Sequence, residues 1–203
     1  MNTPPFDFAN HRVCKACGLF LNQIPVYDDE KKSSVFWVGL SSVLISADEA
    51  MQPLSPNTRT GSLIKKIEDT FVEDVSFYKT NIVKCVPLQD EKIRYPKRHE
   101  MEKCYPNFVD EITRLKPKVV FLLGKQVASF VLNKFAIRTY SLSESFDYCT
   151  YKSQGFTFVP VHHPSYILVY KRKFIDLYVK NINVAITESI VSKEHCKEPI
   201  KAE

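Results

Sequence analysis

Four of the six cysteines in this 203-residue sequence have the types and spacing of metal ligands. Cys14 and Cys17 form a C-x2-C pair, 67 residues separate Cys17 from Cys85, and 18 residues separate Cys85 from Cys104. Four thiolates bind either a zinc ion or an iron–sulfur cluster, and small buried cysteines without a ligand are the third interpretation. The wide second spacing favours a cluster, because structural zinc sites more often use two close pairs.

A carboxamide and an imidazole stand at the ends of two predicted strands. The side chain of Asn81 offers a donor and an acceptor to the edge of a pyrimidine. His163 can donate to an oxygen that gains negative charge as a group departs, and we favour it over His162 because it directly precedes Pro164 and Ser165. The alternatives are local: an Asn that bonds nearby backbone, and a His that caps a turn or helix.

Hydrophobic periodicity predicts the elements that position these groups. Short apolar runs predict strands, and apolar residues at helical spacing predict helices. The expected strands are 35–39, 77–83, 118–124 and 156–161, with an extra edge strand possible over 147–152. The expected helices are 60–71, with Thr60 as its cap, 96–115, 125–135 and 171–189.

This alternation predicts one α/β domain over residues 1–191 and a charged, flexible tail over 192–203. The expected fold is a three-layer α/β/α sandwich around a mostly parallel, four-stranded sheet. In such folds sites form outside the carboxyl ends of the strands. We therefore expect the long connection 40–59, Asn81 and His163 to meet at one edge of the sheet.

Composition limits the possible functions without selecting one. The net charge of +5 and pI near 8.8 permit nucleic-acid binding. Only 5 glycines leave little room for a glycine-rich phosphate loop. No signal peptide or membrane-spanning run is recognisable, so we expect an intracellular protein whose cysteines are reduced or bind metal.

Together, these segments resemble the family 4 uracil-DNA glycosylases. The resemblance rests on the cysteine spacing and on three motifs, in the family's order: Thr80-Asn-Ile-Val-Lys-Cys-Val-Pro87, Pro117-Lys-Val-Val-Phe-Leu-Leu-Gly124 and His163-Pro-Ser-Tyr-Ile-Leu168. It implies a [4Fe–4S] cluster on Cys14, Cys17, Cys85 and Cys104. It also implies that Asn81 reads a base flipped out of DNA and that His163 stabilises the departing base.

The same resemblance implies DNA contacts downstream of His163. Family members use the segment after His-Pro-Ser as a wedge in the minor groove, and an apolar wedge flanked by phosphate contacts can hold a duplex open. We expect contacts from Ser165, Tyr166, Lys171, Arg172 and Lys173. The alternative is a helix start with a solvated basic first turn, an arrangement that the helix dipole disfavours.

The loop after the first strand departs from the family pattern. Leu40 replaces the acidic residue that follows Gly39 in the family, and Leu54 stands where the family has a base-stacking Phe. Asp48 or Glu49 is then the candidate for the carboxylate that positions water. Loss of the aromatic lid would leave a wider pocket, suited to a base other than uracil.

Three functions remain open from the sequence. The favoured one is a monomeric DNA glycosylase that hydrolyses the N-glycosidic bond of uracil or a modified pyrimidine. The second is a catalytically inactive iron–sulfur protein of the same fold that binds DNA. The third is a redox carrier, which would leave the basic segment after His163 unexplained.

Overall fold

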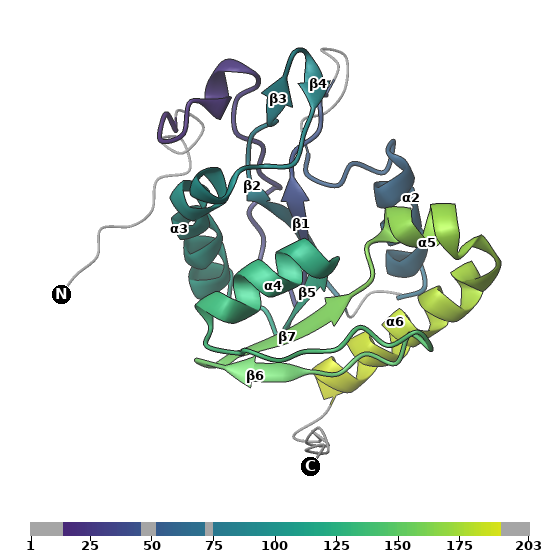
Figure 1. Cartoon of the computed structure of the whole chain (residues 1–203). Helices are drawn as coiled ribbons and strands as arrows, with labels where there is room; N and C mark the ends of the chain where they lie inside the picture. The colour runs from purple at the N-terminus through teal and green to yellow at the C-terminus, as the bar shows by residue number, and fades with distance from the viewer. Residues whose placement is uncertain (1–13, 46–51, 72–74, 192–203) are drawn as a thin grey trace.

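The structure is a computed structural model that describes residues 14–45, 52–71 and 75–191 (Figure 1). Asp48 and Glu49 lie outside these residues, as does the predicted tail over 192–203. Among the helices described, none is long and apolar enough to cross a membrane.

A single five-stranded sheet forms the middle layer, in the order β2-β1-β5-β7-β6. The first four strands are parallel and β6 is antiparallel to β7. The strands are β1 (Val35–Ser41), β2 (Phe77–Val83), β5 (Val119–Leu123), β6 (Tyr151–Ser153) and β7 (Phe156–Val161). The predicted parallel strands are present, and the short fifth strand overlaps the candidate edge strand.

Helices cover both faces of this sheet, which confirms the α/β/α sandwich (Figure 1). One face carries α3 (Arg98–Leu115) and α4 (Lys125–Lys134). The other carries α2 (Arg59–Glu68), α5 (Pro164–Tyr170) and α6 (Ile175–Val191). Short elements complete the fold: 3-10 turns at Leu19–Leu21 and Arg172–Phe174, and a hairpin of β3 (Leu88–Gln89) and β4 (Lys92–Ile93).

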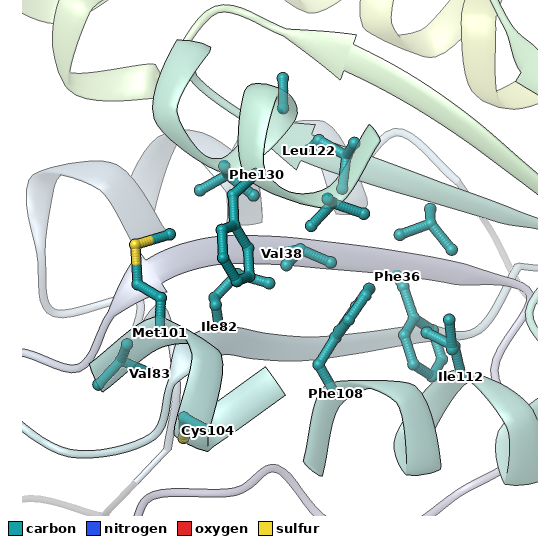
Figure 2. Packing of buried hydrophobic residues seen from close by; sticks show 14 of the residues in the cluster. Phe36, Val38, Ile82, Val83, Met101, Cys104, Phe108, Ile112, Leu122 and Phe130 are labelled. Carbon is teal, nitrogen blue, oxygen red and sulfur yellow. The ribbon is translucent and has the colours of Figure 1, made fainter. Parts of the chain in front are cut away.

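Alternate residues of each strand divide the core into two layers. Phe36 and Val38 pack with the helices α3 and α4, whereas Trp37 packs with α2 and α6. Figure 2 shows the first layer, where Phe108 of α3 and Phe130 of α4 approach β1 from the same side of the sheet. Because both faces are buried, the central strands consist of nearly continuous apolar runs.

Three local predictions were wrong. Thr58, not Thr60, caps α2, since its Oγ1 accepts a hydrogen bond of 3.0 Å from the N–H of Gly61. The predicted helix 171–189 is interrupted, so Lys171 follows the end of α5 and α6 begins at Ile175. The sequence predicts a charged loop over residues 87–96, but this segment contains the β3–β4 hairpin.

Candidate functional site

A cavity of about 860 Å³ lies at the carboxyl ends of the parallel strands. Each strand contributes through the residues at its end or just beyond it. The lining includes Gly39 and Leu40 from β1, Asn81 from β2, Leu123 and Gly124 from β5, and His163 after β7. The parallel topology therefore brings the predicted carboxamide and imidazole to one cavity.

Asn81 is held in the cavity wall by its pairing with Gly39. The two residues are partners in the β1–β2 register, and Asn81 is only 2% exposed. A Cβ built on Gly39 would lie 2.2 Å from Oδ1 of Asn81, so no other residue fits at position 39 without moving this side chain. Oδ1 is buried and has no hydrogen-bond partner within the described part of the protein.

His163 lines the cavity and also caps α5. Its Nδ1 accepts a hydrogen bond of 3.2 Å from the N–H of Ser165 and lies 2.7 Å from the Oγ of that residue. Burial lowers the pKa of His163 below its usual 6.5, which favours the neutral ring at pH 7. With Nδ1 accepting from backbone, the neutral tautomer carries its proton on Nε2.

Gly124 allows His163 to lie close to the end of β5. Its φ is +90°, a conformation that L side chains rarely adopt, and a Cβ there would lie 3.1 Å from Cβ of His163. The rival His162 is not part of the cavity lining. Its Nδ1 lies 3.1 Å from the hydroxyl of Tyr148, so the structure brings His163, and not His162, to the cavity.

Two leucines from the altered loop line the cavity as well. Leu40 follows Gly39 at the end of β1, and Leu54 adopts a left-handed φ of +50°. A Cδ2 of Leu54 would lie 3.1 Å from a Cβ on Gly39, which places Leu54 beside the Gly39–Asn81 pair. The described part of the lining contains no aspartate or glutamate.

The residues after His163 divide into two groups. Ser165 and Tyr166 line the cavity, and the Tyr166 ring stacks on His162 at 5.5 Å between centroids. Lys171, Arg172 and Lys173 do not line it. They lie between the C-terminal end of α5 and the start of α6 at Ile175, so a favourable helix dipole on one side is opposed by an unfavourable one on the other.

A buried lysine next to this wall was not predicted. Lys84 and Glu111 of α3 form an ion pair whose side chains are 1% and 0% exposed. Lys84 Nζ also donates to Oγ1 of Thr80 and, at 2.8 Å, to the backbone oxygen of Asn81. The hydroxyl of Tyr78 donates to Glu111 at 3.0 Å, so Glu111 accepts from several buried donors. This network holds the backbone of Asn81, whose side chain lines the cavity.

The four predicted metal ligands line one small second cavity. Cys14 and Cys17 come from the N-terminal segment, Cys85 follows β2, and Cys104 lies on α3, where Figure 2 labels it. Sγ of Cys104 accepts from the backbone N–H of Lys84 at 3.4 Å. Nδ2 of Asn107 is a second donor, at 3.6 Å.

Among the described residues, no three histidine, cysteine or carboxylate side chains converge closely enough to hold a single metal ion. The four thiols instead surround a common space. Backbone and side-chain N–H groups that point at cysteine sulfur are outer contacts that metal–thiolate sites use, and Cys104 has one of each kind.

Other residues of the main cavity were also missed by sequence reasoning. The cavity is also lined by residues of β4 and the segment after it: Ile93, Arg94 and Tyr95. Their own sequence gives no signal for this, because a two-residue strand in a charged segment has no periodicity to detect. Gly39 could have been recognised, since a glycine inside an apolar strand often marks close approach of another group.

A comparison with protein families places the cavity in a known context. Residues 27–186 match the model of the uracil DNA glycosylase superfamily, a stretch that contains every described strand and all of the described cavity lining. This chain belongs to the uracil-DNA glycosylase superfamily. The match includes Gly39, Asn81 and His163, so the three groups that define the cavity all lie within the family domain.

Two individual proteins refine this assignment. The chain is 29% identical over 136 residues to the Type-4 uracil-DNA glycosylase of Archaeoglobus fulgidus, a match that covers 64% of each protein. The chain thus spans somewhat less than two thirds of that relative. The crystal structure of Pedobacter heparinus SMUG2 superposes with a TM-score of 0.50 at 14% identity, covering 82% of this chain and 80% of the other. That likeness shows the shared fold.

Proposed function

We propose that this protein is a DNA glycosylase of the superfamily's iron–sulfur branch. It would take a uracil or a modified pyrimidine out of the base stack and hydrolyse its N-glycosidic bond. The proposal is supported by the superfamily match and by the similarity to a Type-4 uracil-DNA glycosylase. The geometry of the main cavity suits a flat heterocycle whose edge can form hydrogen bonds.

The unpartnered Oδ1 of Asn81 is the observation that carries the proposal. A buried acceptor without a donor costs roughly 1–3 kcal/mol, so a buried orphan of this kind calls for an explanation. A pyrimidine edge with an N–H would supply that donor, and the amide N–H of Asn81 would in turn donate to a ring carbonyl. The Lys84 network holds the backbone of Asn81 in the position from which its side chain would bind the pyrimidine.

His163 supplies the complementary chemistry. As the C1′–N bond breaks, its electron pair moves onto the base, and negative charge develops on the ring carbonyl oxygens. The neutral imidazole would donate Nε2–H to that oxygen, in a wall that burial has already desolvated. Water then adds its oxygen to C1′, and the proton that it releases passes to the carboxylate that positions it and from there to the anionic nucleobase.

The carboxylate that positions this water would come from Asp48 or Glu49. The described residues nearest to this segment that line the cavity are Ile45 before it and Gln52 after it, which is consistent with a contribution from there. Leu40 and Leu54 would contact the base through apolar surface alone. Replacing the family's aromatic residue by Leu54 would leave room for a substituent on the pyrimidine ring.

We further propose that Cys14, Cys17, Cys85 and Cys104 bind a [4Fe–4S] cluster. When bound, the cluster would serve as a structural tie between the N-terminal segment, the β2–β3 connection and α3. Lys84 would then connect two sites, since its backbone N–H contacts Cys104 and its side chain holds Asn81. The protein's own residues remain responsible for reading the base.

The substrate DNA would cross the cavity mouth, with Ser165, Tyr166 and the Lys171–Lys173 segment on one side. Asn81→Ala and His163→Ala test the proposal directly. Each variant should lose base release, by roughly 100-fold or more in single-turnover experiments, while keeping its affinity for DNA. Equal loss of DNA affinity in both variants would indicate that these residues support the fold instead.

A second candidate function is favoured by one observation: the absence of a carboxylate from the described cavity lining. In that case the protein would bind DNA through the same face without excising a base. No base release would then be detected with wild type or with Asn81→Ala and His163→Ala. DNA affinity would be the only measurable property, and substitutions at Lys171, Arg172 and Lys173 would lower it.

A further inference from the structure

The β3–β4 hairpin lies beyond the carboxyl ends of β1 and β2 (Figure 1), and Ile93 of its second strand lines the cavity. Its turn consists of Asp90 and Glu91, both with left-handed φ values of 49° and 62°, as a tight two-residue hairpin turn requires. The hairpin contains only two residue pairs, so its own ladder cannot hold it rigidly.

Arg94 anchors this hairpin to α3. Its guanidinium donates to both carboxylate oxygens of Glu100, at 2.8 and 2.6 Å, and its backbone N–H donates to the oxygen of Pro87 at 3.0 Å. Glu100 is 4% exposed and also accepts from the N–H of Lys97 at the start of α3. A bidentate, largely buried pair of this kind fixes direction as well as distance.

The residues on either side of Arg94 are exposed and apolar. Ile93 is 51% exposed and Tyr95 is 73% exposed, and both line the cavity. Val169 and Tyr170, at the end of α5, line the same cavity and are 60% and 74% exposed. Large apolar side chains that gather around one opening mark a binding surface. The Arg94–Glu100 ion pair holds the backbone next to Tyr95, which lowers the entropy lost when Tyr95 binds a ligand.

We propose that Tyr95, supported by Ile93, stacks on the DNA base next to the flipped nucleotide. This inference rests on the proposed function, because it assumes that DNA crosses this cavity. Tyr95 would form one apolar contact with DNA from the β3–β4 hairpin. Val169 and Tyr170 would form another from the end of α5. An aromatic face suits any base, so the contact would add affinity without sequence preference.

The charges of this hairpin favour stacking on a base over binding of phosphates. Its turn carries two carboxylates, Asp90 and Glu91, and the guanidinium of Arg94 is engaged by Glu100. Lys92 is the remaining cation of the hairpin. The contact should therefore be insensitive to salt, in contrast to contacts that neutralise phosphates and release counterions.

Binding of Tyr95→Ala to DNA tests the inference. The probe is a fluorescein-labelled duplex with one tetrahydrofuran abasic site flanked by 2-aminopurine. We expect the dissociation constant to rise roughly 5- to 150-fold, with the slope of log K against log salt unchanged. Tyr95→Phe should bind like wild type. Val184→Ala is the control, because Val184 is 46% exposed on α6 and does not line the cavity.

The 2-aminopurine signal separates stacking from a structural role. Wild type and Tyr95→Phe should quench it, and Tyr95→Ala at saturating protein should not. Wild-type affinity in Tyr95→Ala would overturn the inference and leave the proposed function intact, and so would a Tyr95→Phe variant as weak as Tyr95→Ala. A wild-type protein that binds no DNA would overturn the proposed function and this inference together.

Discussion

Gly39 and Asn81 are partners across β1 and β2, and a Cβ on Gly39 would lie 2.2 Å from Oδ1 of Asn81. The backbone of one strand therefore sets the position of the carboxamide on the next. Gly39→Ala should displace this side chain and reduce base release by about 10- to 100-fold, because a charge-bearing leaving group loses one hydrogen bond. Single-turnover kinetics would measure this loss.

A double-mutant cycle shows whether Gly39 acts through Asn81. If it does, Gly39→Ala should cost little more in the Asn81→Ala background, since the contact is already gone. Fully additive losses would contradict this coupling and would point to a separate effect of Gly39 on Leu54, whose Cδ2 lies 3.1 Å from the same Cβ position.

The His163 ring should give base release an acidic limb. Burial lowers the pKa of His163 below 6.5, so the ring stays neutral near pH 7 and charges only at lower pH. Protonation of Nδ1 would break its hydrogen bond from the N–H of Ser165. Folding stability should decline as the pH falls below about 6.5, because the unfolded state takes up the proton more readily. Activity should decline at still lower pH, where the ring of the folded protein becomes charged.

A pH–rate profile from pH 5 to 8 measures this limb. His162→Gln is the matched control, because His162 is the neighbouring histidine and does not line the cavity. The rate of base release by His162→Gln should still decline at acidic pH. The residual rate of His163→Gln should not depend on pH in this range. Activity that increases on acidification would contradict a neutral His163 donor.

The buried Lys84–Glu111 pair predicts a large loss of stability when one partner is removed. Lys84→Met leaves Glu111 charged and buried, which should lower the free energy of unfolding by about 3–5 kcal/mol. Urea denaturation measures this change. Lys65→Met should cost at most ~1 kcal/mol, because the Lys65–Asp69 pair is 51% and 58% exposed.

Replacing both members should recover much of that loss, because Lys84→Met with Glu111→Leu removes both charges together. The double variant should nevertheless release base more slowly than wild type, since the backbone oxygen of Asn81 has lost its donor. Wild-type rates in the double variant would show that the pair supports stability alone.

The four clustered cysteines predict an iron content of about four atoms per chain. Cys104→Ala should lose most of that iron, because the remaining three thiols cannot complete the ligand set. Cys149→Ala should keep it, since Cys149 is exposed and apart from the cavity that the other four line. Elemental analysis of protein purified without oxygen measures both variants. One zinc per chain and no iron would contradict the cluster.

Long-range topology was readable from the sequence and short-range geometry was not. Buried parallel strands such as Val119–Leu123 are continuous apolar runs, and this pattern places Asn81 and His163 at one edge. The β3–β4 hairpin has only two residues in each strand, too few for periodicity to appear. Its position depends on the Arg94–Glu100 pair, a tertiary contact that no local pattern encodes.

Two other errors have different physical causes. The helix expected over 171–189 shows helical spacing throughout, yet its first turn is a 3-10 segment that follows the end of α5. Lys84 reads as one more surface lysine in a strand motif, because burial of a charge depends on Glu111, 27 residues further along the chain.

Base release from defined DNA tests the central claim most directly. Duplexes that contain uracil, hypoxanthine or a bulky modified pyrimidine would be incubated with wild type, Asn81→Ala and His163→Ala, and free bases identified by mass spectrometry. The account predicts that wild type releases uracil or the modified pyrimidine and that both variants lose this release. Bound but intact DNA in every reaction would contradict the account and establish a protein that binds DNA without excising a base.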